Sequence, residues 1–386
     1  MKADQSPGKD EEITIIGAGP AGLVCSIVLA RAGWRVLVRE WRKTVDTRFH
    51  GDFQGLENWS DETDILEELK SYGIDINFDV HPVYNGIAFD AWGASYEVGS
   101  DKPLYYLVHR GPDARSFSHG LLDCARHAGV EVSFGDRVKA IDGPAVLAAG
   151  PRVADAIAAG YVFETDMADG NWLCLDDSLA PDGYSYLLVH GGRGTVASCM
   201  FKGFKRQADY VERTVSMFRE RAGLEMKNPR SFGGFANFRL PRTGVQGGHP
   251  VIGEHAGFQD ALAGFGMRYA IRSGALAARS LIEGVDYTRL WRRELLPRLR
   301  TSMSNRFVFS ILGDRGRRWV LANRLSGMDT RIQLQNLYRP SRLKRILFPI
   351  AQWRHRAMLS DKSCNHVDCS CIWCRCGDAM PALQLN

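Results

Sequence analysis

Three glycines near the start of the chain have the spacing that holds a phosphate group. Gly17, Gly19 and Gly22 form a G-x-G-x-x-G pattern directly after the apolar run at residues 13 to 16. Gly17 permits a tight turn from strand to helix, Gly19 lets backbone approach a pyrophosphate, and Gly22 lets the helix pack closely on the strand. The residues between the glycines, which would line the same turn, are Ala18, Pro20 and Ala21. The pattern therefore predicts a dinucleotide-binding turn, with the N-terminus of the next helix facing the phosphates.

A carboxylate follows the second expected strand at the distance of a ribose ligand. Residues 34 to 39 form an apolar and basic run. Glu40 follows this run, about 20 residues beyond the glycine pattern. In dinucleotide-binding folds, an acidic residue at this point binds the ribose hydroxyls. The unit spanning residues 13 to 40 therefore favours a dinucleotide cofactor over an ordinary glycine-rich turn.

A second group of residues has metal-binding chemistry. Five of the nine cysteines lie between residues 364 and 376, and the candidate ligands there are Cys364, His366, Cys369, Cys371, Cys374 and Cys376. Thiolates with a histidine suit tetrahedral Zn²⁺, and Cys371-x-x-Cys374 has a common chelate spacing. An iron–sulfur cluster also needs about four cysteines, but the spacing matches neither standard ferredoxin pattern. We expect zinc ahead of iron–sulfur, and a tail without metal is the remaining alternative.

The composition is that of a globular protein in a reducing compartment. Of 386 residues, 45% are apolar, and no run approaches the roughly 18 apolar residues of a membrane span. The four remaining cysteines are scattered among apolar neighbours, as buried thiols are; they are Cys25, Cys124, Cys174 and Cys199. We therefore expect a cytoplasmic protein.

The net charge of +5 conceals an uneven distribution. Between Arg289 and Met358 there are 17 basic and 3 acidic residues, which gives this segment +14 and leaves −9 for the rest of the chain. Basic and apolar residues alternate over residues 342 to 356, a pattern typical of helices that lie on anionic lipid. A solvated helix that packs its apolar side on the main body explains the pattern equally well. No nucleic-acid motif accompanies the charge, so we expect no nucleic-acid partner.

The first half of the sequence contains the elements that must position the cofactor. Residues 61 to 72 are expected to form a helix, followed by β-like segments through Val98. The chain then returns through a strand at residues 103 to 110 and a helix near residues 121 to 128. Strands are expected at residues 130 to 134 and 145 to 150, and the second ends at Gly150. Small residues at that point suit a return to the sheet beside the cofactor.

The second half is expected to contain a mostly β region and a long helix. Residues 161 to 239 are mostly strand-like, with a hairpin signal at residues 191 to 194 and one helix near residues 208 to 222. A short strand at residues 250 to 253 follows. Gly264 then opens a helix that runs through Ile282.

Taken together, these segments resemble the flavoprotein superfamily of aromatic hydroxylases and, more closely, the geranylgeranyl reductases. The resemblance covers roughly residues 12 to 285 and implies an α/β fold with a discontinuous Rossmann-like FAD-binding domain. It also implies an inserted, mostly β substrate domain. The charge pattern described above adds a helical, basic C-terminal module beyond the residues that the resemblance covers. The expected FAD-binding domain comprises residues 10–55, 103–160 and 245–285, and the expected substrate domain comprises residues 56–102 and 161–244. The basic module is expected at residues 286–360 and the cysteine-rich tail at residues 361–386.

The resemblance also implies the residues that would hold the adenosine half of FAD. Gly17, Gly19 and Gly22 would lie at the pyrophosphate, and Glu40 would bind the adenosine ribose. Three further positions correspond to cofactor contacts in the family: Arg110, Val138 and Gly150. Arg110 precedes a helix start at residues 116 to 122, and the backbone of Val138 would contact the adenine.

A second motif of the resemblance implies the flavin end of the site. Gly253 and Glu254 are similar to the family's Gly-Asp segment, and Gly264, Gly266 and Met267 to the glycine-rich turn that faces the flavin ring. Two departures are that Glu254 replaces aspartate and that Phe265 stands where the reductases usually have glutamate. The loop at residues 46 to 55 also lacks the Lys-x-Cys-Gly-Gly segment of many reductases. Tyr184 and Tyr186 are the candidate walls of the substrate cavity.

The activity implied by the resemblance is hydride transfer from reduced FAD to a C=C bond of an isoprenoid, geranylgeranyl-type or other lipid-like substrate. The reductant would be NAD(P)H, bound transiently, or a carrier protein, because the sequence has a single dinucleotide fingerprint. The residues able to supply the proton are His50, His81, His255 and Tyr186, and we assign the role to none of them. The alternatives are an FAD-dependent monooxygenase of the same fold and a non-catalytic flavin- and metal-containing protein that interacts with membrane surfaces. A membrane partner would place the protein peripherally on the inner face of the membrane.

Overall fold

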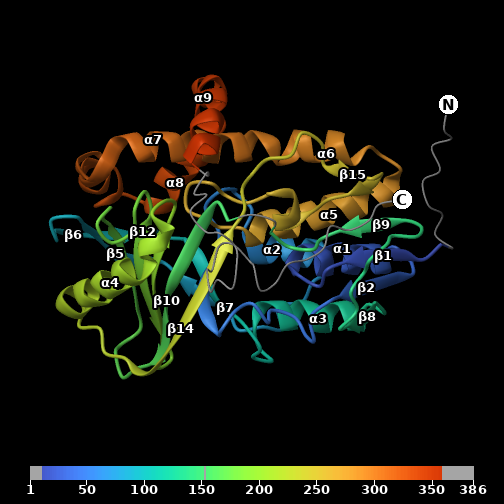
Figure 1. The fold of residues 1–386 in the computed structure, drawn as a ribbon, viewed down its shortest axis with the longest axis horizontal. Helices are drawn as coiled ribbons and strands as arrows, with labels where there is room; N and C mark the ends of the chain where they lie inside the picture. The colour runs from blue at the N-terminus through green and yellow to red at the C-terminus, as the bar shows by residue number, and fades with distance from the viewer. Residues whose placement is uncertain (1–10, 152–153, 359–386) are drawn as a thin grey trace.

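The computed structural model describes residues 11–151 and 154–358. Figure 1 shows an elongated molecule with a parallel sheet and its helices at one end and a large, mostly antiparallel sheet at the other. The C-terminal helices lie along one long edge and connect the two ends.

The N-terminal unit is a parallel sheet of four strands in the order β8-β2-β1-β9. The strands are β1 (Ile13–Ile16), β2 (Val36–Glu40), β8 (Glu131–Phe134) and β9 (Ala145–Leu147). In register, Ile16 of β1 lies beside Arg39 of β2 and Leu147 of β9. The carboxyl ends of these strands therefore meet at one edge, where a doubly wound sheet binds its ligand.

Three helices accompany this sheet: α1 (Pro20–Arg31), α3 (Phe117–His127) and α5 (Met267–Glu283). Most of α1 is buried because α1 contacts the sheet, α3 and α5. The contact with α5 is close, since a Cβ on Gly274 would lie 2.3 Å from the carbonyl oxygen of Ala21. A glycine at residue 274 therefore fixes how near α5 comes to the start of α1.

A small antiparallel sheet follows, in the order β3-β7-β4. Its strands are β3 (Asp52–Glu57), β4 (His81–Val83) and β7 (Tyr105–Arg110). Asp52 pairs with Arg110 at one end of β3, and Glu57 pairs with Tyr105 at the other. Helix α2 (Ile65–Ser71) begins later than the helix expected from residue 61, because Asp64 caps it by accepting a hydrogen bond from the Leu66 N–H at 2.8 Å.

The large sheet has seven strands in the order β14-β10-β13-β12-β11-β5-β6. Their bounds are β5 (Asn85–Asp90), β6 (Ser95–Gly99), β10 (Ala156–Glu164), β11 (Gly170–Leu175), β12 (Tyr184–His190), β13 (Arg193–Met200) and β14 (Lys227–Ala236). The hairpin expected at residues 191 to 194 is confirmed, since Gly191 and Gly192 both have positive φ and connect the paired residues His190 and Arg193.

The two faces of the large sheet pack against different partners. Leu187 and Val189 of β12 lie in a core with Phe218 of helix α4 (Gln207–Ala222), which follows a short helix, η1 (Phe204–Arg206). Tyr186 and Leu188 alternate with them and pack towards the small sheet. This alternation places α4 on one face and the small sheet on the other.

The chain returns to the parallel sheet after residue 236. A short hairpin, β15 (Val245–Gln246) with β16 (His249–Pro250), leads to Val251, which forms a bridge with Leu147 of β9. A short helix, η2 (Gly253–Ala256), then precedes α5. Residues far apart in the sequence therefore meet at the carboxyl edge of the parallel sheet.

The C-terminal helices are α6 (Tyr287–Glu294), α7 (Leu296–Val320), η3 (Leu321–Leu325), α8 (Thr330–Tyr338) and α9 (Arg342–Met358). Helix α7 is kinked at Gly313, where φ is +55°, and it packs against α6, α8 and α9. Within the described residues, none of the helices combines the length and apolarity needed to cross a membrane.

The predicted fold class is confirmed: a Rossmann-like α/β unit is combined with a mostly β region and C-terminal helices. The division of the chain into four parts stays a prediction.

Candidate functional site

The glycine pattern forms a tight turn whose three glycines have different neighbours. Gly17 has a φ of +113°, and a Cβ there would lie 2.3 Å from the carbonyl oxygen of Ala148. A Cβ on Gly22 would lie 2.0 Å from the carbonyl oxygen of Gly17. Gly19 has an ordinary φ of −77° and open space where its Cβ would stand. The fold itself requires Gly17 and Gly22, whereas only a ligand in the open space would require Gly19.

Two helix N-termini at the site have no side-chain cap. Gly19 is the N-cap of α1 and Pro20 its first residue, while Gly266 is the N-cap of α5 and Met267 its first residue. The first N–H groups of a helix lack partners within it and carry partial positive charge. Both helix starts therefore suit an anionic or hydrogen-bond-accepting ligand group. Ala18 and Ala21, on either side of Gly19, are buried.

Glu40 is buried at the end of β2, and its carboxylate joins the glycine turn to the next loop. Its Oε2 accepts a hydrogen bond from the Ala18 N–H at 2.9 Å, and its Oε1 accepts one from the Arg42 N–H at 3.0 Å. An ionised carboxylate has about four acceptor positions, so both oxygens can accept further hydrogen bonds. Glu40 therefore fits the expected ribose contact and also orders the turn.

Arg110 is buried at the end of β7 and pairs with Asp46. Its Nε and Nη2 each donate a hydrogen bond of 2.7 Å to the Asp46 carboxylate, and its guanidinium carbon lies 4.2 Å from the centre of the Phe49 ring. Burial lowers the pKa of Arg110, but Asp46 more than offsets this effect, so the pKa is raised. Arg110 therefore holds the loop between β2 and β3, and its contact with the cofactor stays a prediction.

A second ion pair connects the same loop to η2. Arg48 Nη2 donates a hydrogen bond of 2.6 Å to Glu254 Oε2, and Asn237 Nδ2 donates one of 3.1 Å to the Glu254 carbonyl oxygen. The N–H of Gly253 donates to Ser273 Oγ at 2.9 Å. The replacement of aspartate by Glu254 therefore leaves a carboxylate at this position, held by Arg48.

Asp260 organises the loop that precedes α5. Its Oδ2 accepts hydrogen bonds from the Ala263 N–H at 2.6 Å and from Tyr338 Oη at 3.0 Å, and the Asp260 N–H donates to the Phe265 carbonyl oxygen at 3.0 Å. Burial raises the pKa of Asp260 to about 6. All these partners belong to the loop or to α8, so the carboxyl group of Asp260 stabilises the conformation of the loop.

Gly264 leaves open space at the turn of this loop. Gly264 has a φ of +79° with nothing near its absent Cβ, and its carbonyl oxygen accepts a hydrogen bond of 2.6 Å from Gln259 Nε2. Phe265, which stands where the reductases usually have glutamate, packs edge-on against Trp59 with ring centres 4.7 Å apart. Phe265 therefore supports the loop through packing, without a charge.

Tyr184 and Tyr186 lie on the face of β12 that is turned towards the small sheet. Tyr184 Oη donates a hydrogen bond of 2.6 Å to the carbonyl oxygen of Ala263, in the loop before α5, and the two tyrosine rings are 6.2 Å apart. Burial raises the pKa of both phenols well above 10, so both are neutral. Burial also raises the pKa of Cys199, beside Tyr184 on β13, to about 12. The two tyrosines therefore lie as neutral side chains beside the glycine loop, and their place in a substrate cavity stays a prediction.

Asp52, the first residue of β3, is a buried acid that no sequence motif indicates. Its Oδ1 accepts a hydrogen bond from the His50 N–H at 3.0 Å, and its Oδ2 accepts one from Gln54 Nε2 at 2.7 Å. Burial raises the pKa of Asp52 more than these hydrogen bonds and Arg110 lower it. In the sequence it is one polar residue in a polar loop, and only its burial distinguishes it.

The histidines considered as proton donors have different surroundings. His50 is exposed, and the His81 ring lies 3.7 Å from that of His190, with burial lowering the pKa of His81. His255 is buried, and its Nδ1 accepts a hydrogen bond of 3.1 Å from the Ala149 N–H. His255 therefore connects η2 to the segment after β9.

The remaining adenosine-side positions lie around β9. Val138 is partly buried against the core of the parallel sheet. Gly150 has a φ of +81° and open space at its absent Cβ, three residues beyond the end of β9. Their cofactor contacts stay predictions.

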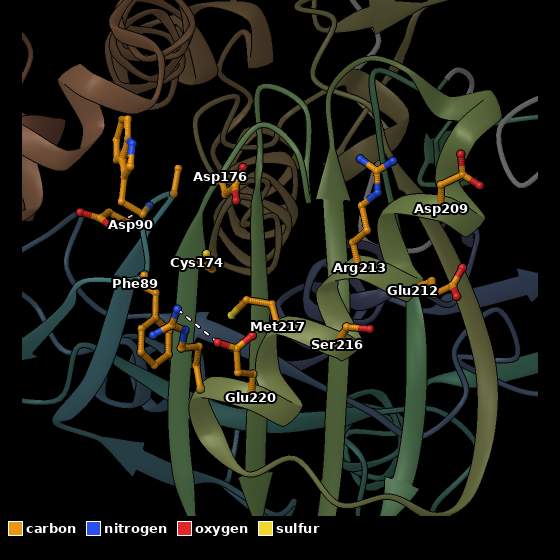
Figure 2. Close-up of a pocket in the computed structure, with 14 residues that line it drawn as sticks. Phe89, Asp90, Cys174, Asp176, Asp209, Glu212, Arg213, Ser216, Met217 and Glu220 are labelled. Carbon is orange, nitrogen blue, oxygen red and sulfur yellow. Dashed lines mark hydrogen bonds and ion pairs between the residues drawn. The ribbon is translucent and has the colours of Figure 1, made fainter.

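A cavity of about 730 Å³ opens between α4 and the large sheet (Figure 2). Its lining includes Asp209, Glu212 and Glu220 of α4 and Asp90 and Cys174 of the sheet. Cys174 belongs to the core on the α4 face, whereas Tyr186 lies on the opposite face. The large sheet therefore separates this cavity from the glycine turns.

The cysteine-rich tail, with Cys364, His366, Cys369, Cys371, Cys374 and Cys376, lies outside the described residues. The other four cysteines are free thiols, and residues 11–151 and 154–358 contain no cluster of three or more metal-binding side chains. Metal binding by the tail stays a prediction.

Solved structures of flavoproteins share the arrangement described above. A geranylgeranyl bacteriochlorophyll reductase-like protein from Thermoplasma acidophilum superposes with a TM-score of 0.67 at 15% identity, covering 90% of this chain and 98% of that chain. A flavoprotein/dehydrogenase from Cytophaga hutchinsonii superposes with a TM-score of 0.63 at 14% identity, covering 90% and 100%. A p-nitrophenol 4-monooxygenase from Pseudomonas putida superposes with a TM-score of 0.55 at 14% identity, covering 89% and 98%.

No protein-family model matches the chain. No curated protein sequence matches it either. The structural matches therefore establish the fold alone. It is the FAD-binding, Rossmann-like flavoprotein fold, which reductase-like proteins, halogenases and monooxygenases share.

Proposed function

We propose that this protein is an FAD-dependent oxidoreductase. The observation that carries the proposal is the open space beside Gly19, next to the uncapped start of α1 and close to the buried carboxylate of Glu40. The fold requires the other two glycines of the pattern but gives no steric reason for a glycine at residue 19. A dinucleotide pyrophosphate supplies that reason.

The described residues fit FAD along one path. Gly17, Ala18, Gly19 and the start of α1 would bind the pyrophosphate, and Glu40 would bind the adenosine ribose. Glu254 would contact the ribitol from its position beside Arg48, while the N–H groups of Gly266 and Met267 would face the flavin ring. FAD, when bound, supplies the capacity to transfer a hydride.

The substrate we propose is an apolar, isoprenoid-type lipid with a C=C bond that is reduced. Tyr184 and Tyr186 support this choice, because two half-buried, neutral rings beside the glycine loop suit an apolar chain. The reductant would be NAD(P)H or a carrier protein. A zinc-loaded tail would be a structural addition to this activity.

Asp52 is our candidate for the group that holds the proton needed at the second carbon of the double bond. Its raised pKa favours the protonated form, and its two hydrogen-bond donors, the His50 N–H and Gln54 Nε2, lie on the loop and strand beside the site. Asp260 also has a raised pKa, but its oxygens hold the glycine loop and Tyr338. Asp52 is therefore the acid that can release a proton without dismantling the loop.

The test is to purify the full chain, identify any bound flavin and lipid, and reduce the flavin anaerobically. Adding a polyprenyl lipid should reoxidise the flavin and yield the saturated product. Absence of flavin from correctly folded protein would overturn the proposal.

The same experiment in air tests the main alternative, an FAD-dependent monooxygenase. The loop at residues 46 to 55 lacks the cysteine found in many reductases, and the fold is shared with monooxygenases. Oxygen consumption coupled to a hydroxylated product, with no anaerobic turnover, would favour that activity. A flavin that no lipid or oxygen reoxidises would favour the non-catalytic alternative.

A further inference from the structure

The outer face of α9 exposes four large apolar side chains. Leu343, Ile346, Ile350 and Trp353, here called the α9 stripe, are 66%, 69%, 51% and 71% exposed. Their spacing of three, four and three residues places them on one side of a helix. Figure 1 shows α9 standing out from the molecule beyond α7.

The opposite side of α9 is the one that packs on the protein. Ala351 is buried and Phe348 is partly buried in a cluster with Met303 of α7, Phe238 and Ala261. The helix therefore already buries one apolar side, and core packing does not explain the stripe.

Exposed basic residues flank the α9 stripe. Arg342 and Arg345 lie along one edge of the stripe, and Arg354 lies along the other edge. All three side chains are exposed. Residues 342 to 358 contain no aspartate or glutamate. An apolar stripe between cationic flanks matches the boundary between the headgroups and the acyl chains of an anionic membrane.

We propose that the α9 stripe docks this protein onto an anionic lipid surface. The stripe inserts among the lipids, and Arg342, Arg345 and Arg354 bind the headgroups. The charge argues against a second copy of this chain as the occupant, because a two-fold contact between stripes would bring two sets of these arginines together without an acid on either helix.

Docking also fixes which part of the protein lies near the membrane. The cluster beneath α9 includes Ala261, which is adjacent in sequence to Asp260 of the glycine loop. A lipid surface at α9 therefore lies on the same side of the molecule as the elements that support this loop. The docking proposal does not depend on which reaction the protein catalyses.

The test is co-sedimentation of the full chain with vesicles of phosphatidylcholine alone or with about one third phosphatidylglycerol. We expect binding to the anionic vesicles that weakens at least tenfold when NaCl rises from about 0.05 M to about 0.5 M. The double variant I346N/W353N should bind at least tenfold more weakly at low salt. R342Q/R345Q should bind more weakly at low salt and lose most of the salt dependence.

The matched control is I282N/V285N, which makes two exposed apolar residues polar near the end of α5. We expect it to bind like the wild type, and circular dichroism should show that every variant is folded. Equal binding to neutral and anionic vesicles, or full binding by I346N/W353N, would overturn the proposal. A dimer of the wild-type chain in sedimentation velocity that I346N/W353N abolishes would also overturn it, because the stripe would then join two copies.

Discussion

The phenolic oxygen of Tyr338 in α8 lies 3.0 Å from Oδ2 of Asp260, in the loop that leads into α5. Both side chains are buried, and 78 residues separate them in the sequence. The same carboxyl group also accepts the Ala263 N–H, so this hydrogen bond connects the C-terminal helices to the loop expected to face the flavin. Ser302 and Arg306 of α7 make further hydrogen bonds to the same loop. The C-terminal helices therefore help to shape the site.

Tyr338→Phe removes this hydrogen bond and leaves Asp260 with one donor fewer in a buried position. We expect a loss of about 1 to 3 kcal/mol in the free energy of unfolding, together with weaker flavin binding. Urea unfolding and flavin titration measure the two effects. Tyr106→Phe is the matched control, because Tyr106 Oη donates to Asp64 at 2.8 Å, away from the glycine loop. Equal flavin affinity in the two variants would contradict a role for Tyr338 in the site.

Gly19→Val should abolish FAD binding while the protein stays folded. The space beside Gly19 is open and its φ is ordinary, so the side chain fits the protein but fills the position of the pyrophosphate. The measurement is flavin absorbance after purification, with circular dichroism as the check on folding.

Gly17→Val is the contrasting variant. Its Cβ would stand 2.3 Å from a carbonyl oxygen, at a φ of +113°, so we expect it to impair folding as well as flavin binding. A Gly19→Val protein with normal flavin content would argue against a pyrophosphate at this turn.

Asp52→Asn should slow reduction of the substrate by at least about 100-fold while leaving flavin content unchanged. Because the active form of Asp52 would be protonated, wild-type turnover should fall as the pH rises through its raised pKa. That dependence should be absent from the residual activity of the variant. Stopped-flow measurements of flavin reoxidation across the pH range would compare the pH dependence of the wild type with that of the variant. An unchanged pH profile in Asp52→Asn would remove Asp52 from the mechanism.

The buried carboxyl group of Asp155 should make the stability of the protein depend on pH. It is fully buried, its Oδ2 accepts the Phe238 N–H at 2.9 Å, and its Oδ1 lies 4.0 Å from His355 Nε2 of α9. Burial raises the pKa of Asp155 from 3.8 to about 6. The unfolded chain releases this proton at a lower pH than the folded chain, so the folded state loses stability as the pH rises through this interval.

Asp155→Asn removes this ionisation and keeps an acceptor for the Phe238 N–H. We expect the variant to be more stable than the wild type at about pH 8, by up to roughly 3 kcal/mol, with the difference shrinking towards about pH 4. Thermal unfolding across this range measures it. A difference that does not vary with pH would show that Asp155 does not titrate as described.

Local patterns in the sequence predicted the parts of the site that depend on neighbouring residues. The requirements at Gly17 and Gly22, and the hairpin at Gly191 and Gly192, follow from backbone geometry over a few residues and are confirmed. The position of Glu40 at the end of β2 was also predicted, because strand and helix lengths fix it.

The sequence could not reveal the contacts that depend on distant residues. Asp46, 64 positions from Arg110 in the sequence, accepts two of its hydrogen bonds, and no local pattern indicates this pairing. The burial of Asp52 and the bond between Tyr338 and Asp260 are likewise products of tertiary packing. The charge pattern of residues 342 to 356 was visible in the sequence, yet only the structure shows which side of α9 is left uncovered.

The bridge between Leu147 and Val251 and the packing of α5 on α1 have a consequence for synthesis of the protein. While the chain emerges from the ribosome, the glycine turn is available early, but α5 is complete only at Glu283. The glycine turn at the start of α1 therefore lacks the helix that packs on α1 until residue 283 has been made. Firm retention of the proposed FAD would therefore require most of the polypeptide to have been made.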